Sequence, residues 1–107
     1  MFSGDNHYGN LDIQDVIDAF EDITGHDFYF FRMQKRANSS TITLKYLYAS
    51  LARHLRFSYP QIGRSLQRDH STVVHYINRH NLLMEKDENY LQRYKDLIYY
   101  AELLLVK

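Results

Sequence analysis

Five consecutive residues in the middle of the chain, Arg68 to Thr72, carry side chains that donate or accept hydrogen bonds. An apolar pattern of helical spacing follows them, so Asp69 is expected to begin a helix whose first-turn N–H groups and positive dipole end face outward. Such an end suits phosphates and base edges. Asp69 would accept from a cytosine amino group, while Ser71 and Thr72 would bond to bases or touch a thymine methyl group. His70 and Arg68 would donate to base or phosphate oxygens. A capping aspartate with polar neighbours is also a routine helix start.

Other reactive side chains form no catalytic or metal-binding pattern. His70, His75 and His80 recur every five residues, about 140° apart on a helix, so they do not share one face as metal ligands would. His75 is instead expected to pack against neighbouring helices. Contiguous Asp69, His70 and Ser71 cannot align acid, base and nucleophile in a relay. The chain has no cysteine and no phosphate-binding Gly-Lys pair. We therefore expect no enzyme activity, metal, nucleotide or other cofactor.

The elements that must position the polar run are predicted as a short helix, a tight turn and a longer helix. Ser58 and Gln61 fit a capping box, and Pro60 is tolerated in the first turn that follows. The short helix is predicted over 59–66, the turn over 67–68 and the longer helix over 69–84. This succession is the outline of a helix-turn-helix.

Apolar residues at helical spacing predict most of the remaining chain as helix. A first helix over 11–24 has Asn10 or Asp12 as its cap and Gly25 as its stop. Asp27 would cap a short turn, whose side chains Phe28, Phe30 and Phe31 are expected in the core. The other predicted elements are an exposed loop over 32–41, an amphipathic helix from 43 to just before 58, and a terminal helix over 91–105 after a break at 85–88. We therefore predict an all-α fold, with a flexible segment at 1–10 and one compact domain at 11–107.

Composition and charge limit the class of protein. The chain has 107 residues, of which 45% are hydrophobic, which suits a single domain. The lack of cysteine, of a long apolar run and of a secretory signal predicts a soluble cytoplasmic protein. The net charge is zero, yet residues 1–31 carry seven acids and no Lys or Arg, whereas residues 32–79 carry nine bases and one acid. A polyanion would meet a strongly positive segment, unless the two segments neutralise each other across the fold.

Two segments of this chain carry a family pattern. They are Arg68-Asp69-His70-Ser71-Thr72-Val73-Val74-His75 and, upstream, Ser58-Tyr59-Pro60-Gln61-Ile62-Gly63. They resemble the signatures R-D-H-[ST]-T-V-x-H and [ST]-x-x-[ED]-I-G of domain IV, the C-terminal DNA-binding domain of the bacterial chromosomal replication initiator DnaA. The similarity also includes the helix at 11–24, the basic loop at Lys35-Arg36 and Leu51-Ala52-Arg53-His54-Leu55, so it covers about residues 11–84.

The resemblance implies a Trp-repressor-like helix-turn-helix domain that binds double-stranded DNA with sequence preference. It implies a cytoplasmic, nucleoid-associated protein of bacteria or phage that acts in replication control or in transcription. The base-reading residues that it implies are Arg68, Asp69, His70, Ser71, Thr72, Tyr59 and Pro60. The implied phosphate and minor-groove contacts are Lys35, Arg36, Lys45, Arg53 and Arg79.

Three differences from the family pattern predict another DNA site or a weaker sequence preference. The turn before Arg68 is one residue shorter, with Gln67 in place of glycine. The basic loop is short and leaves Arg36 as the arginine for the minor groove. Tyr76 replaces a small residue, and its ring would clash with the DNA backbone or pack along it. The initiator's ATPase and oligomerisation regions do not occur in this sequence, so we expect DNA binding without remodelling.

A protein-interaction module is the alternative function. The acidic first 31 residues and the apolar end Leu103-Leu104-Leu105-Val106 would then meet a partner, or form a homodimer through the C-terminal helix. On that interpretation the fold persists while DNA binding is lost. The salt dependence of DNA binding separates the two functions. Contact with about five phosphates predicts that a plot of log affinity against log salt concentration has a slope of about −4 to −5.

Overall fold

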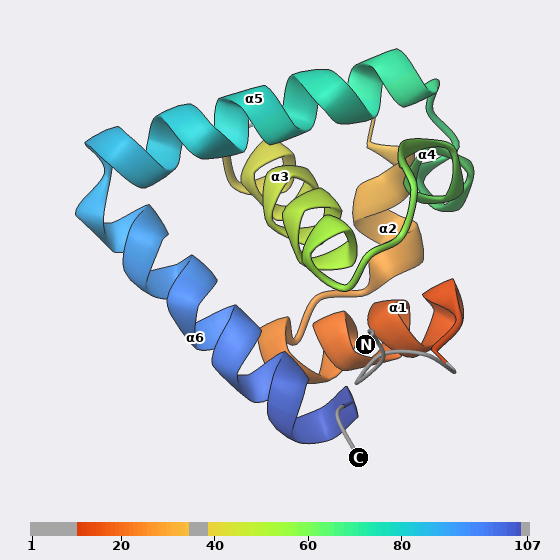
Figure 1. Ribbon diagram of the computed structural model, residues 1–107, viewed down its shortest axis with the longest axis horizontal. Coiled ribbons are helices and arrows are strands. Elements are labelled where there is room, and N and C mark those ends of the chain that lie inside the picture. Colours follow the sequence, from red (N-terminus) through yellow and green to blue (C-terminus); the bar gives the residue numbers. More distant parts are fainter. Residues whose placement is uncertain (1–10, 35–38, 106–107) are drawn as a thin grey trace.

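Six helices and no strand make up the described part of the chain, a computed structural model of residues 11–34 and 39–105. In chain order the helices are α1 (Ile13–Thr24), α2 (Phe28–Met33), α3 (Ser39–His54), α4 (Tyr59–Leu66), α5 (His70–Lys86) and α6 (Glu88–Leu105). α3 lies in the middle, and the other five helices surround it (Figure 1). The predicted all-α fold is therefore confirmed. The predicted flexible segment at 1–10 lies outside the described residues.

The core is built around α3, which is buried on every side over much of its length. All residues from Leu44 to Ala52 are buried, and the ring of Tyr48 packs edge-on against Phe20 of α1. A helix with one apolar stripe buries one face, whereas a helix packed on all sides by neighbours has no free face. The sequence predicted an amphipathic helix that begins at position 43. The structure corrects the start, which is Ser39, and the amphipathic character, because the central part of α3 has no exposed side.

Capping side chains fix the ends of α1 and α4 as the sequence predicts. At α1, the Asp12 carboxylate accepts the backbone N–H of Asp15 over 3.1 Å, and Gly25 ends the helix with a left-handed φ of 74°. At α4, the Ser58 hydroxyl accepts the N–H of Gln61 over 3.2 Å, and the Gln61 side chain accepts the N–H of Ser58 over 2.8 Å. These reciprocal bonds satisfy N–H groups that have no partner inside the helix.

The segment between α1 and α3 differs from its prediction. Phe28 and Phe31 are buried as expected, but Phe30 is exposed, because the one-and-a-half turns of α2 present only one side to the core. Arg32, predicted in an exposed loop, is half-buried in α2: its guanidinium lies 4.7 Å from the ring centroid of Tyr29 and donates to a carbonyl oxygen of α4. The predicted loop is thus shortened at both ends, and its residues 35–38 lie outside the described part.

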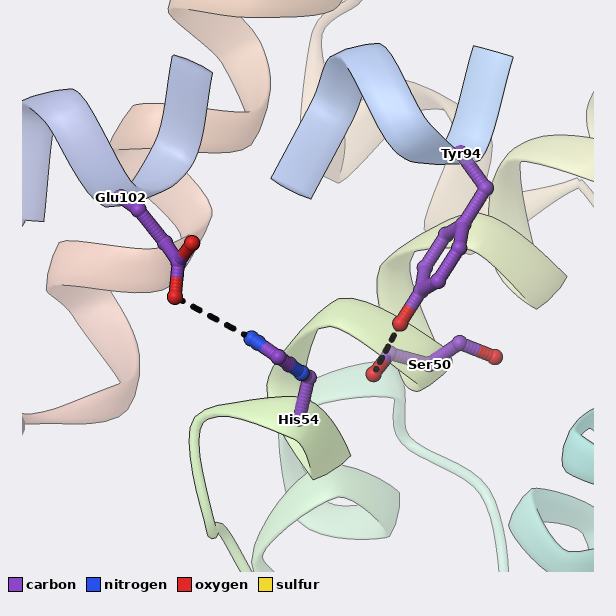
Figure 2. A network of polar contacts seen from close by, with 4 residues as sticks. All are labelled: Ser50, His54, Tyr94 and Glu102. Atoms are coloured by element: carbon purple, nitrogen blue, oxygen red, sulfur yellow. Dashed lines mark hydrogen bonds and ion pairs between the residues drawn. The ribbon is translucent and has the colours of Figure 1, made fainter. Parts of the chain in front are cut away.

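Helix α6 leaves the end of α5 at a wide angle and packs against α1 and α3 (Figure 1). Two polar contacts attach it to α3: the Tyr94 hydroxyl donates to the Ser50 carbonyl, and a Glu102 carboxylate oxygen lies 3.4 Å from Nε2 of His54 (Figure 2). Between α5 and α6, Nδ1 of the buried His80 is hydrogen-bonded to the hydroxyl of a neighbouring α6 tyrosine over 2.6 Å. Burial lowers the pKa of His80 to about 4. His80 is therefore neutral at pH 7.

Candidate nucleic-acid interface

Gly63 allows α5 to begin close against α4. The N–H of Arg68 donates to the Gly63 carbonyl over 2.8 Å, and a Cβ atom at position 63 would lie 2.6 Å from the carbonyl oxygen of Arg68. Gln67 reverses the chain with a left-handed φ of 56°. Buried Ile62 and Leu66 of α4 belong to the same core as Val73 of α5. The predicted short helix, tight turn and longer helix are present, an arrangement compatible with a helix-turn-helix.

The amino end of α5 is open to solvent. The side chains of Asp69 and His70 are 69% and 64% exposed, and Ser71 is exposed beside them. Asp69 occupies the N-cap position, but its carboxylate does not cap the helix, which corrects the prediction. It accepts instead from the Ser71 hydroxyl over 2.8 Å and lies 3.2 Å from Nδ1 of His70. The Ser71 hydrogen bond, with a smaller contribution from nearby His70, lowers the pKa of Asp69.

Arg68 and Thr72 complete this polar end. Both are half-buried, and the Arg68 guanidinium donates to the Gln67 carbonyl over 3.1 Å. The backbone N–H of Thr72 donates to the Asp69 carbonyl over 3.0 Å, which closes the first turn of α5. The structure thus brings the five predicted side chains of positions 68–72 together at one helix end, with a negative carboxylate already engaged by its neighbours.

The amino end of α4 presents a second set of predicted residues. Pro60 is exposed and Tyr59 is half-buried. The Arg53 guanidinium lies over the Tyr59 ring, 4.7 Å from its centroid, and donates to the Phe57 carbonyl over 3.1 Å. A cation held on an aromatic face and by a carbonyl has few conformations to lose when it meets an anion. Arg53 is exposed, and these two contacts hold its guanidinium beside Tyr59 before any partner binds.

Lys45 does not occupy the surface position that a phosphate contact requires, so this prediction is corrected. It is 3% exposed, and its ammonium donates to the Gln34 carbonyl over 2.9 Å. Burial, and to a lesser extent the nearby Arg68 charge, lower the pKa of Lys45. Its position on the central helix α3 explains the burial, because neighbouring helices cover that part of α3. Lys35 and Arg36 lie outside the described residues, and their predicted contacts stay predictions.

The outer face of α5 carries Arg79, which is exposed as a phosphate contact requires. It lies seven residues after Thr72, two helical turns along the same face. Two predictions on this helix are wrong. His75 is exposed near that face and does not pack between helices, whereas Tyr76 is buried with its ring 5.7 Å from that of Tyr46 and therefore cannot project toward DNA. Sequence reasoning missed His75 as a candidate, although its spacing from Thr72 and Arg79 places it close to them.

The acidic helix α1 does not cover the amino end of α5. Helix α1, which carries most of the amino-terminal acids, lies on the opposite side of α3 from α5 (Figure 1). It packs against α2, α3, α4 and α6, with exposed carboxylates at Asp12, Asp18 and Asp22. The amino end of α5 is thus free of the acidic helix. Because α1 packs against helices of the basic segment 32–79, the two segments do meet in the fold, but away from the amino end of α5.

Two further observations concern the described residues alone. They contain no group of three or more acidic, histidine or cysteine residues arranged to hold a metal ion. None of their helices is long and apolar enough to cross a membrane.

Comparison of the chain with protein-family models, with curated proteins and with solved structures finds no match.

Proposed function

We propose that this chain binds double-stranded DNA with sequence preference by placing the amino end of α5 in the major groove. The observation that carries the proposal is the solvent-exposed end of α5, where Asp69, His70 and Ser71 gather donors and acceptors away from the acidic helix. Helix amino ends favour anionic and hydrogen-bonding partners. The resemblance to DnaA domain IV supports the same function and assigns base reading to this turn.

The dimensions of α4 support the proposed docking. Its eight residues span about 12 Å, which is close to the width of the major groove, about 12 Å. With the amino end of α5 inside the groove, the far end of α4 would reach the groove's edge, where phosphates line the backbone. Arg53 lies at that far end, beside Tyr59 and Pro60, for which the resemblance implies base contacts. In a helix-turn-helix the first helix crosses the backbone in this manner.

Selection from a random duplex pool tests the proposal directly. We expect enrichment of one sequence. With Lys45 removed from the five predicted contacts, the plot of log affinity against log salt concentration should have a slope of about −3.6. The initiator's own box, included as a competitor, would measure how far the preferences agree. A role in replication control or in transcription then follows from where the selected sequence occurs. Absence of binding to any duplex at low salt would reject the proposal.

A homodimeric interaction module is the second candidate, and it is supported by an apolar face on α6. Tyr99, Tyr100, Leu103 and Leu104 are all exposed. A groove of about 440 Å³ lies between α1 and three of these residues, Tyr100, Leu103 and Leu104. Exposed apolar side chains that gather on one helix are typical of contact surfaces. A second copy could bury this face against its own, because a twofold axis brings identical surfaces together. Association through this face does not involve the amino end of α5, so this candidate holds even where no duplex is bound.

A further inference from the structure

Arg56 adopts a backbone conformation that disfavours an arginine. It lies in the turn between α3 and α4 with a φ of 76°, in the left-handed region. The Cβ atom of an L-residue approaches the carbonyl oxygen there, so glycine is the residue best suited to the position. At the end of α1, where the chain adopts a φ of 74°, the sequence does place a glycine, Gly25, whereas the end of α4 places Gln67 at a φ of 56°. An arginine at position 56 therefore calls for a reason.

Contacts within the folded chain do not provide that reason. The Arg56 side chain is exposed, and within the described ranges no hydrogen bond or ion pair involves it. Its backbone N–H donates to the Arg53 carbonyl, which any residue except proline could do. A positive charge just past the carboxyl end of α3 is favourable, but a histidine and Arg53 already supply charge or donors in the last turn of that helix.

The position of Arg56 relative to the proposed interface supplies a reason. Arg56 lies three positions before Tyr59, the first residue of α4, and three positions after Arg53, whose guanidinium rests on the Tyr59 ring. If α5 enters the major groove, this end of α4 meets the sugar-phosphate backbone at the edge of the groove. Strained residues are retained where function requires their side chains.

We propose that Arg56 contacts a DNA phosphate beside Arg53, and that this contact is why an arginine occupies a position suited to glycine. The inference rests on the proposed function, because it needs a duplex docked at α4 and α5. It adds to that function a residue at the α3–α4 corner. A phosphate contact positions the protein on the duplex without reading its sequence, so Arg56 would contribute equally on every duplex.

Three substitutions at position 56 test this role. Arg56→Ala removes the charge and keeps the strain, Arg56→Gly removes both, and Arg56→Lys keeps the charge. We expect the alanine and glycine variants to bind all duplexes about eightfold more weakly at about 0.1 M salt, with slopes shallower by about 0.9, the effect of one phosphate contact. The lysine variant should restore the slope. Arg93→Ala, which removes an exposed arginine from α6, is the matched control and should leave the slope unchanged.

Thermal unfolding of the same variants measures the strain. The glycine variant should melt above the alanine variant, and the alanine variant close to the wild type, because Arg56 has no contact to lose in the folded chain. The proposal is overturned if Arg56→Ala binds DNA with the wild-type slope, or if lysine fails to restore it. It is also overturned if Arg56→Ala melts several degrees below the wild type, since the arginine would then serve the fold. A wild type that binds no duplex would instead reject the proposed function itself.

Discussion

The carbonyl oxygen of Arg68 lies 2.6 Å from the point where a Cβ atom at Gly63 would stand. In most helices a glycine-to-alanine change stabilises by about 0.5–1 kcal/mol. Here the added methyl group meets backbone that cannot rotate away, so Gly63→Ala should destabilise the protein by about 1–3 kcal/mol and weaken DNA binding. Urea denaturation and duplex titration measure the two effects. Gly25→Ala, strained by its positive φ but in open space, should lose stability and keep its affinity for DNA.

Substitutions at the two ends of the interface should differ in kind. Thr72→Ala or His70→Ala should weaken binding to the preferred sequence by about 1–3 kcal/mol and blur the preference. Arg53→Ala should weaken every duplex alike and make the salt slope shallower by about one. Titrations with the preferred and a scrambled duplex, at several salt concentrations, separate the two patterns. Unchanged discrimination in Thr72→Ala would show that the recognition turn lies elsewhere.

Lys45 should behave as a core residue. Because its ammonium is buried on the Gln34 carbonyl, Lys45→Ala removes a buried hydrogen bond and leaves space in the core. We expect a loss of stability of about 1–3 kcal/mol and an unchanged salt slope. Chemical denaturation and salt-dependent titration provide the measurements. If the salt slope of Lys45→Ala were instead shallower than that of the wild type by about one, Lys45 would contact a phosphate after all.

Stability should fall in mild acid because of His80. Its pKa is about 4 in the folded chain and 6.5 as a free side chain. Between these values the unfolded chain binds a proton that the folded chain does not, so stability rises with pH across this window and levels off above it. The full effect approaches about 3 kcal/mol. Denaturation at pH 4, 5, 6 and 7 should show that stability rises with pH more steeply in the wild type than in His80→Gln. The carboxylates that titrate in this range are the same in both proteins, so the difference between the two slopes reports His80. Equal slopes would contradict the assignment.

The apolar face of α6 predicts association of two copies. Leu103 is 64% exposed and Leu104 is 50% exposed, on the same side as two tyrosines. We expect a dimer in sedimentation at micromolar concentration, and a monomer for Leu103→Glu because a charge on this face would lose its hydration on burial. Tyr29→Ala, which changes an exposed aromatic residue on α2, is the control. A wild-type monomer would remove this prediction.

Local signals along the chain made the helix ends predictable. Asp12, Ser58 with Gln61, and Gly25 act through neighbours three or four residues away, so their spacing alone was sufficient. Residues whose environment depends on several helices were not predictable in this way. Lys45 carries a charge that usually favours the surface, yet it lies on the helix that all the others surround. The phenylalanines of α2 share one residue type but lie on different sides of a short helix.

The candidate site shows the same division. The residue types at positions 68–72 indicated a polar helix start, and the structure has one. The internal use of the Asp69 carboxylate by Ser71 was not predictable, because capping and side-chain bonding are both open to an aspartate at this position. His75 was expected to be buried and is exposed, whereas Tyr76 was expected at the surface and is buried, because α5 buries the stripe of Val73, Tyr76 and His80. That stripe contains polar residue types, which hid its helical period.

Helix α1 carries four acids and no Lys or Arg, whereas the chain from the end of α3 to the start of α5 carries Arg53, Arg56, Arg64 and Arg68 against Asp69 alone, which gives this molecule a charge asymmetry despite its zero net charge. Near a polyanion, such a particle experiences a torque that turns the cationic side inward and the carboxylates outward. Fewer collisions then arrive in a wrong orientation, so association would be faster than an isoelectric point near neutrality suggests, and it would slow as added ions shorten the range of the field.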